Sequence, residues 1–313
     1  MASRDMVMGI FFLFQTTLGI LGNSALLCCF IISDFTGIKA KPTDLIVKHL
    51  TCSSSMVLLC RGIPQTMTAF GQTYFLDDFT CKLVFYFHRV ARGVSLGSTS
   101  LLSVFQFITI SPGNSKWAQL KVRIPRIVGP SLGLCWTIQL LVYVFIPIYT
   151  TDIWSVQNVS GVKEFGYCAV VNPGRVINIL NVMFLTFNDV MFLGLMMWAS
   201  GSMVFILIKH KQMVEYIHKS LSPRSSLETR ATQSILILVS TFVVFYVISI
   251  VLTFYLSVID VTFMWLSNAN LAMSACFPAF CPFLLLRHYI SVFRLCCACS
   301  YQTTHCACGV REH

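Results

Sequence analysis

Seven stretches of this 313-residue chain are apolar and long enough to cross a lipid bilayer. They cover residues 7–32, 45–70, 79–111, 127–150, 176–208, 231–259 and 261–286. A helix needs about 20 apolar residues to span the hydrocarbon core. Inside that core each backbone N–H and C=O must find a partner within the protein, and a helix provides one. The pattern therefore predicts an all-α membrane protein built as a bundle of seven transmembrane helices.

The composition excludes the main soluble alternatives. Apolar residues make up 56% of the chain and charged residues only 11%, whereas soluble domains carry about 25% charged residues. So few charges cannot cover the surface of a soluble protein of this length. The net charge of +10 does not indicate a nucleic-acid partner, because basic residues collect in the cytoplasmic loops of membrane proteins. We expect membrane lipid, and no nucleic acid, around the chain.

The distribution of basic residues predicts the orientation of the bundle. With the N-terminus outside, fourteen Lys and Arg residues lie in the inner loops and the tail, and four lie in outer segments. Basic residues favour the cytoplasmic side, so we predict the N-terminus outside and the C-terminus in the cytoplasm. Residues 1–290 then form the seven-helix domain, and residues 291–313 form a cytoplasmic, cysteine-rich tail.

The cysteines and a glycosylation sequon fit this orientation. Of the 14 cysteines, only Cys81 and Cys168 lie in outer segments, where disulfides persist. We therefore predict that these two are bonded to each other. The sequon Asn158-Val159-Ser160 falls in the same outer loop as Cys168, on the side where glycosylation occurs.

The tail carries five cysteines, of which Cys296 and Cys297 come soon after the last span. Juxtamembrane cysteines are common palmitoylation sites, and these two are the candidates. The spacing of the remaining tail cysteines is not a usual one for zinc. The alternative is that all five remain unmodified thiols.

The motifs within the spans resemble those of G-protein-coupled receptors. Gly22-Asn23 in the first span, Trp136 in the fourth and Pro282 in the seventh are similar to motifs of the rhodopsin-like class. Other motifs depart from that class. The foot of the third span reads Phe105-Gln106-Phe107 where the class has Asp-Arg-Tyr, and the second span has no aspartate near Ser54. The usual sodium site and arginine lock are therefore not expected.

Longer blocks identify the chain as a member of the vomeronasal type-1 receptor family. The resemblance runs from about the first span to the tail and rests on Lys41–Ile46, Phe75–Pro112, Trp198–Phe205, Ser222–Ser226, Arg230–Gln233 and Ala275–Pro278. It implies a pheromone receptor in the plasma membrane of vomeronasal sensory neurons. It also implies a small-molecule pheromone as ligand and an inhibitory-type heterotrimeric G protein as partner. Ser54 departs from the family, which has asparagine at the position where we place it.

Three nitrogen-bearing side chains, His88, Arg89 and Arg92, lie in the outer half of the third predicted span. Charged groups inside a bilayer are costly and usually face the bundle interior. One interpretation is a polar wall that binds the ligand among spans three, five, six and seven, with Asp189 of the fifth span contributing. The other is a structural ion pair between an arginine and Asp189. Because one arginine would stay unmatched, we expect ligands that carry an acceptor group, with an anion as one option.

Arg61, near the outer end of the second predicted span, is expected to extend its side chain toward the membrane interface.

No pattern supports an enzyme. Gly93–Gly97 matches the G-x-S-x-G motif of serine hydrolases, but that motif requires a strand–turn–helix, and here it lies within a predicted helix. Small residues at this position instead allow neighbouring helices to approach closely. We predict neither a cofactor nor a metal.

Two rival functions remain: a bitter-taste-type receptor, which the Cys81–Cys168 pair argues against, and a transporter or channel, for which the expected inverted repeat is missing.

The orientation predicts that Asn158 carries a glycan. Enzymatic deglycosylation of the expressed protein should increase its gel mobility, and Asn158→Gln should abolish that increase. Unchanged mobility of the treated wild-type protein would contradict the prediction.

Overall fold

The computed structural model describes residues 2–35, 41–72, 75–112, 117–153, 162–164, 167–171, 174–217, 223–258 and 266–286. Predictions for Asn158, Cys296, Cys297 and the tail 291–313 lie outside these residues.

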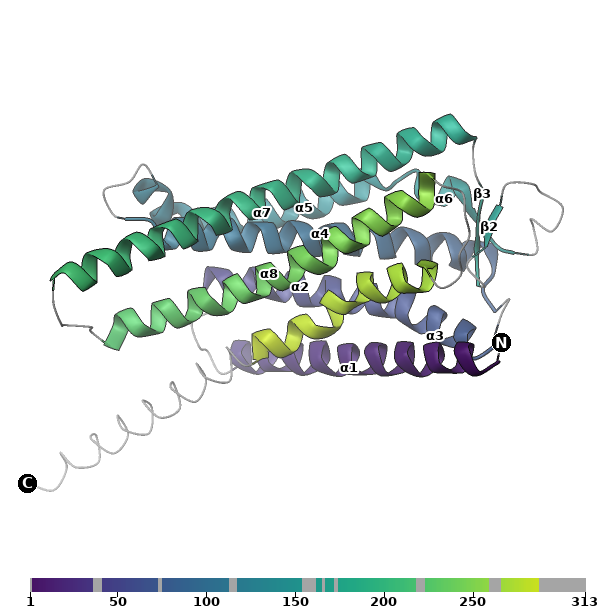
Figure 1. The fold of residues 1–313 in the computed structure, drawn as a ribbon, viewed down its shortest axis with the longest axis horizontal. Coiled ribbons are helices and arrows are strands. Elements are labelled where there is room, and N and C mark those ends of the chain that lie inside the picture. Colours follow the sequence, from purple (N-terminus) through teal and green to yellow (C-terminus); the bar gives the residue numbers. More distant parts are fainter. Residues whose placement is uncertain are drawn as a thin grey trace, which may run out of the picture.

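The described chain is a bundle of long helices with a small sheet at one end (Figure 1). The helices are α1 (Ala2–Phe35), α2 (Pro42–Val57), the π-helical turn η1 (Leu58–Gly62), α3 (Ile63–Ala69), α4 (Asp78–Ile110), α5 (Ala118–Val142), α6 (Ile146–Tyr149), α7 (Arg175–Ile217) and α8 (Pro223–Val258). A last helix covers Leu266–Leu286. Strands β1 (Thr150–Thr151), β2 (Val162–Glu164) and β3 (Ala169–Val171) form an antiparallel sheet in the order β1-β3-β2. We call this end of the bundle, where the N-terminus also lies, the sheet end.

Six helical segments of the described chain are long and apolar enough to cross a membrane. They are Met6–Phe35, Asp78–Ile110, Gln119–Tyr149, Ile179–Lys209, Val239–Leu256 and Leu266–Leu286. The predicted span 45–70 is also helical, from Pro42 to Ala69, but η1 divides it, and it is not among the six. That a seventh segment crosses the membrane therefore stays a prediction.

Helices α7 and α8 extend beyond the apolar runs from which they were predicted. α7 continues beyond residue 208 to Ile217, and α8 begins at Pro223 instead of residue 231. A helix satisfies its own backbone in water as well as in lipid, so it does not end where polar side chains begin. The predicted span 127–150 is not one regular helix, because a turn at residues 143–145 separates α5 from α6.

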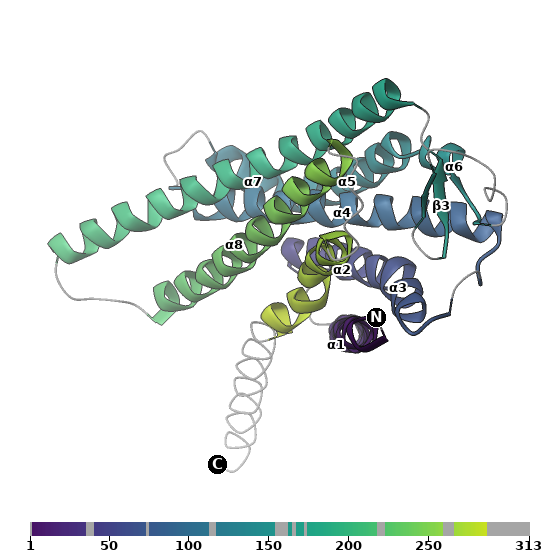
Figure 2. The same cartoon turned by 45° about the vertical axis from the view of Figure 1, so that its right-hand side comes forward.

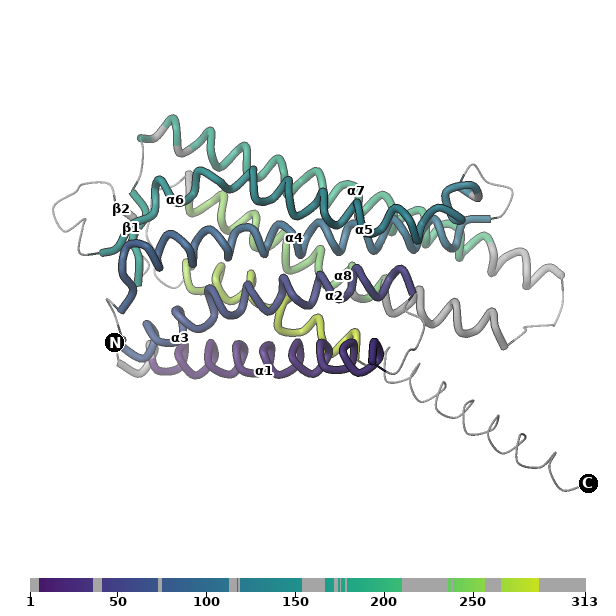
Figure 3. Tube along the Cα trace, turned by 180° about the vertical axis from the view of Figure 1, so that it is seen from behind, coloured from purple at the N-terminus to yellow at the C-terminus, as the bar shows by residue number. Residues whose placement is uncertain are grey.

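Helix α4 is the centre of the bundle. Its most apolar part is 72% buried inside the protein, whereas the corresponding figure for the other five candidate spans is 22–44%. It packs against α2 on one side and against α5 and α7 on the other (Figure 3). α1 lies at the margin of the bundle, against α2 and α3 (Figure 2). Residues of α4 therefore sit where several helices meet.

Polar side chains tie neighbouring helices together. Asn23 Nδ2 of α1 donates to the carbonyl oxygen of Pro278 in the last helix at 2.9 Å. Trp136 Nε1 of α5 donates to His49 Nδ1 of α2 at 3.1 Å. Asn23 and Trp136 were singled out as receptor-class motifs, and both have a packing role.

The glycines of the G-x-S-x-G motif lie inside α4 and face α5. A Cβ atom added at Gly93 would lie 2.1 Å from Gln139 Oε1, and one added at Gly97 would lie 2.3 Å from Cys135 Sγ. Such distances leave no room for a side chain. The expectation that these small residues allow close helix approach is confirmed.

Gly93→Ala should therefore destabilise the receptor, because the buried Gln139 side chain would have to move. Overpacking of this kind costs about 1–3 kcal/mol. The matched control is Gly133→Ala on α5, where an added Cβ meets nothing within 4 Å. We expect Gly93→Ala to lower the unfolding midpoint in detergent and the surface level in cells, with Gly133→Ala close to wild type. Equal midpoints for the two variants would contradict the close contact.

Candidate functional site

A disulfide bond joins Cys81 in the first turns of α4 to Cys168, just before β3. The pair expected from the sequence is thus bonded, with Cα atoms 5.8 Å apart. It fastens the segment 167–171 over the sheet end of α4. Tyr167 is only 2% exposed there, and its ring lies 6.0 Å from that of Phe85 and 6.5 Å from that of Phe75. Burial raises the pKa of the Tyr167 phenol, so the phenol is neutral at pH 7.

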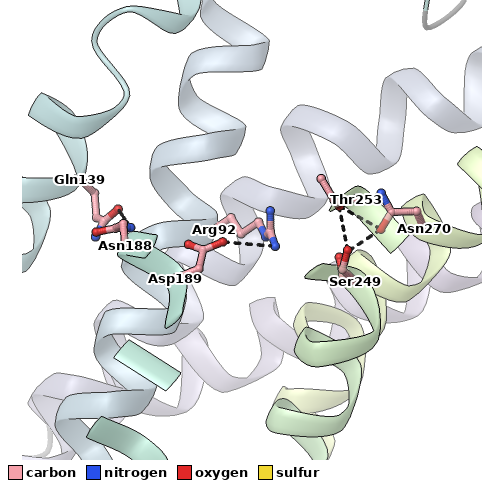
Figure 4. Close-up of polar contacts among 7 residues, drawn as sticks. All are labelled: Arg92, Gln139, Asn188, Asp189, Ser249, Thr253 and Asn270. Carbon is pink, nitrogen blue, oxygen red and sulfur yellow. Dashed lines mark hydrogen bonds and ion pairs between the residues drawn. The ribbon is translucent and has the colours of Figure 1, made fainter. Parts of the chain in front are cut away.

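A buried ion pair crosses the bundle below this segment. Arg92 Nη2 of α4 lies 3.6 Å from Asp189 Oδ2 of α7 (Figure 4). The side chains are 13% and 8% exposed. The Arg92 guanidinium also lies over the ring of Tyr246 of α8, 4.7 Å from its centroid. The position of Arg92 over an aromatic face adds a cation–π interaction to the ion pair. This cluster connects α4, α7 and α8.

Further polar contacts flank the ion pair on both sides (Figure 4). Asn188 Nδ2 of α7 lies 3.4 Å from Gln139 Oε1 of α5. On the other side, Ser249 and Thr253 of α8 share the side chain of Asn270 in the last helix. These polar side chains therefore link α5 to α7 and α8 to the last helix.

His88 lies on the same face of α4 as Arg92, as predicted, but it has a different environment. It is 4% exposed, and its Nε2 atom has no hydrogen-bond partner among the residues that the structure describes. It lines a narrow hollow together with Cys60, Arg61, Val84, Phe85 and Tyr167. The hollow is too narrow to hold a water molecule.

Arg61 does not extend to the membrane interface, and that expectation was wrong. Its side chain points inward and lines the hollow beside His88, and its Nε atom is buried without a hydrogen-bond partner in the described part of the chain. Arg61 belongs to η1, where the helix is wound more loosely than an α-helix. A single π-turn of this kind cannot be read from hydropathy, so the apolar pattern contains no sign of the inward direction.

Arg89 is the third arginine of this region. It lies within electrostatic reach of Arg92, Tyr143 and Asp189. Among the ion pairs of the described residues, however, the partner of Asp189 is Arg92 and not Arg89. Among the described residues, three arginines and one carboxylate therefore share this part of the bundle, which leaves an excess of positive charge there.

The four residues predicted to contact ligand thus lie in one region of the bundle, but they do not all contact one another. Arg92 and Asp189 form the ion pair, Arg89 lies near it, and His88 faces the hollow. Sequence reasoning missed Tyr246, because an aromatic residue in an apolar helix carries no distinguishing signal. It also missed Tyr167, although its position next to Cys168 could have drawn attention to it.

Comparison with known proteins gives a consistent result. The model of the vomeronasal organ pheromone receptor family matches residues 6–298. Vomeronasal type-1 receptor 4 of Homo sapiens is 48% identical over 299 residues, which are 95% of this chain and 99% of that protein. Vomeronasal type-1 receptor 2 of Homo sapiens is 46% identical over 288 residues, 92% of this chain and 73% of that protein. Olfactory receptor class A-like protein 1 of Danio rerio is 30% identical over 298 residues, 95% and 94% of the two chains.

The buried ion pair predicts non-additive effects of mutation. Arg92→Leu and Asp189→Leu should each destabilise the protein by about 3–5 kcal/mol, because each leaves an unpaired buried charge. The double variant should recover much of that loss. Unfolding midpoints and surface levels of the three variants provide the measurement. Additive losses in the double variant would show that the two side chains do not stabilise each other.

Proposed function

Because the chain belongs to the vomeronasal type-1 receptor family of pheromone receptors, we propose that it binds a small chemosignal at the sheet end of the bundle and activates an inhibitory-type G protein. The chain is a multi-pass membrane protein and a signalling receptor, not an enzyme. We place it in the plasma membrane of vomeronasal sensory neurons. The sheet end, with Cys81 and Cys168, then faces outward, and the C-terminus lies in the cytoplasm.

The observation that carries the proposal is the Arg92–Asp189 ion pair with Tyr246. It lies beneath the disulfide-bonded segment and joins three helices. A ligand that contacts His88, Arg89, Arg92 or Asp189 would change the electrostatic balance between α4, α7 and α8. Ligands shift an equilibrium between helix arrangements only through different affinities for them. Contacts to a junction of three helices supply such a difference.

The G protein is assigned to the opposite end of the bundle, where the predicted inner loops carry most of the basic residues. Binding of the ligand and of the G protein to one helix arrangement couples the two sites reciprocally. The family match supports this mechanism over the rival transporter or channel, and it supports a vomeronasal over a bitter-taste-type receptor.

Expression of the chain together with an inhibitory-type G protein tests the proposal. Cells would be screened with a panel of small apolar compounds, and cyclic AMP would be measured. We expect at least one compound to lower cyclic AMP, with pertussis toxin abolishing the response. Mock-transfected cells are the control. A receptor-dependent response that persists unchanged in toxin would contradict inhibitory-type coupling.

A further inference from the structure

The first turns of α5 carry three exposed cations, Lys121, Arg123 and Arg126. α5 begins at the end of the bundle opposite the sheet end (Figure 3). None of the three takes part in an ion pair among the described residues. By contrast, Lys48 of α2, a cation near the same end, is paired with Asp34 at 2.6 Å. The cations of α5 therefore differ from their neighbour on α2 in lacking a carboxylate.

Acidic residues are missing from this part of the chain. Between Asp78 and Asp152 the sequence contains none, and these two lie at the sheet end, beside the first turn of α4 and after β1. α5 packs against α2 and α4. In the first turn of α2, Asp44 accepts a hydrogen bond from the backbone N–H of Lys41 at 2.7 Å. The described neighbours of α5 therefore supply no ion-pair partner to its cations.

Arg123 and Arg126 lie on the side of α5 that faces away from the bundle. Ile124 and Val128, one helical turn apart and therefore on one face, are 6% and 1% exposed and pack inside the protein. Val122, on the opposite side, is 82% exposed. In a membrane protein such an exposed apolar face is covered by lipid. The two arginines therefore share the lipid-facing side of α5.

The position of Arg126 along the helix places it at the level of the lipid head groups. Arg126 directly precedes the charge-free apolar run 127–150, from which a span was predicted. The hydrocarbon core thus begins just after Arg126, and Arg123 lies about 4.5 Å farther out along the helix axis. A charged side chain that faces hydrocarbon is costly, and long basic side chains extend toward the interface. Lipid phosphates are the anions available there.

We propose that Arg123 and Arg126 form a docking site for a phosphoinositide of the inner leaflet. A guanidinium binds phosphate through two parallel hydrogen bonds, and a phosphoinositide offers its diester phosphate and a ring phosphate to the two arginines. The acyl chains lie along the exposed apolar face of α5, which continues with Leu134 and Leu141, 61% and 67% exposed. Basic sites between or beside membrane helices on the cytoplasmic side bind such head groups. The assignment to the inner leaflet rests on the proposed orientation, whereas the contact with lipid does not.

Native mass spectrometry of the purified full-length receptor in an uncharged detergent tests the site. The probes are phosphatidylinositol 4-phosphate, phosphatidylinositol and soluble inositol 1,4-bisphosphate, and the readout is the probe concentration that half-saturates the bound state. We expect phosphatidylinositol 4-phosphate to bind at a concentration at least fivefold lower than phosphatidylinositol. The double variant Arg123→Gln with Arg126→Gln should raise its half-saturating concentration at least tenfold.

The matched control is the double variant Lys41→Gln with Lys209→Gln, which removes two exposed cations from the segment before α2 and from α7. It should leave binding within twofold of wild type. If the double glutamine variant does not fold, Arg123→Lys with Arg126→Lys takes its place. That variant keeps both charges but loses the guanidinium fork, and should weaken binding at least threefold.

Four results would overturn the proposal. They are equal binding of the two lipids, binding that survives the arginine changes, an equal loss in the lysine control, which would indicate general surface charge, and equally strong binding of inositol 1,4-bisphosphate, which would indicate a site for free phosphates. The assay contains neither agonist nor G protein, so its failure would leave the proposed function untouched.

Discussion

A charge buried inside a membrane protein must be matched, and this requirement organises the centre of the bundle. Arg92 of α4 satisfies it with Asp189 of α7 and the ring of Tyr246 of α8. The cost of separating such a pair in a low-dielectric interior holds the three helices in register. α4 can serve this purpose because Gly93 and Gly97 bring it close to α5 and because it packs against α2 and α7.

At the sheet end, arginines outnumber the carboxylates that could pair with them among the described residues. The arginines of this region share one carboxylate, that of Asp189, and it forms its ion pair with Arg92. His88 is buried and Arg61 is partly buried, and both line the same hollow. Arg61 Nε and His88 Nε2 have no hydrogen-bond partner among the described residues. The disulfide between Cys81 and Cys168 keeps Tyr167 over them. One part of the polar interior thus holds the helices together, and a neighbouring part has nitrogen atoms without hydrogen-bond partners in the described chain.

Much of this arrangement could be predicted from the sequence, and the failures have identifiable causes. Charge-free apolar runs are long-range signals, so six helical segments appear where they were expected. In the predicted membrane topology only Cys81 and Cys168 lie in outer segments, and these two form a disulfide bond. The pairing of Arg92 rather than Arg89 with Asp189 depends on helix rotation, which hydropathy does not report. The inward direction of Arg61 depends on the local π-turn η1, which has no signature in a single sequence.

The direction of the Arg61 side chain is the central claim, and an experimental density map of the receptor in a lipid nanodisc tests it most directly. At a resolution that shows side chains, the account predicts the Arg61 guanidinium inside the hollow, beside His88 and below Tyr167, with Arg92 against Asp189. Density that places Arg61 outward among the lipid head groups, or against Asp189 in place of Arg92, would contradict it.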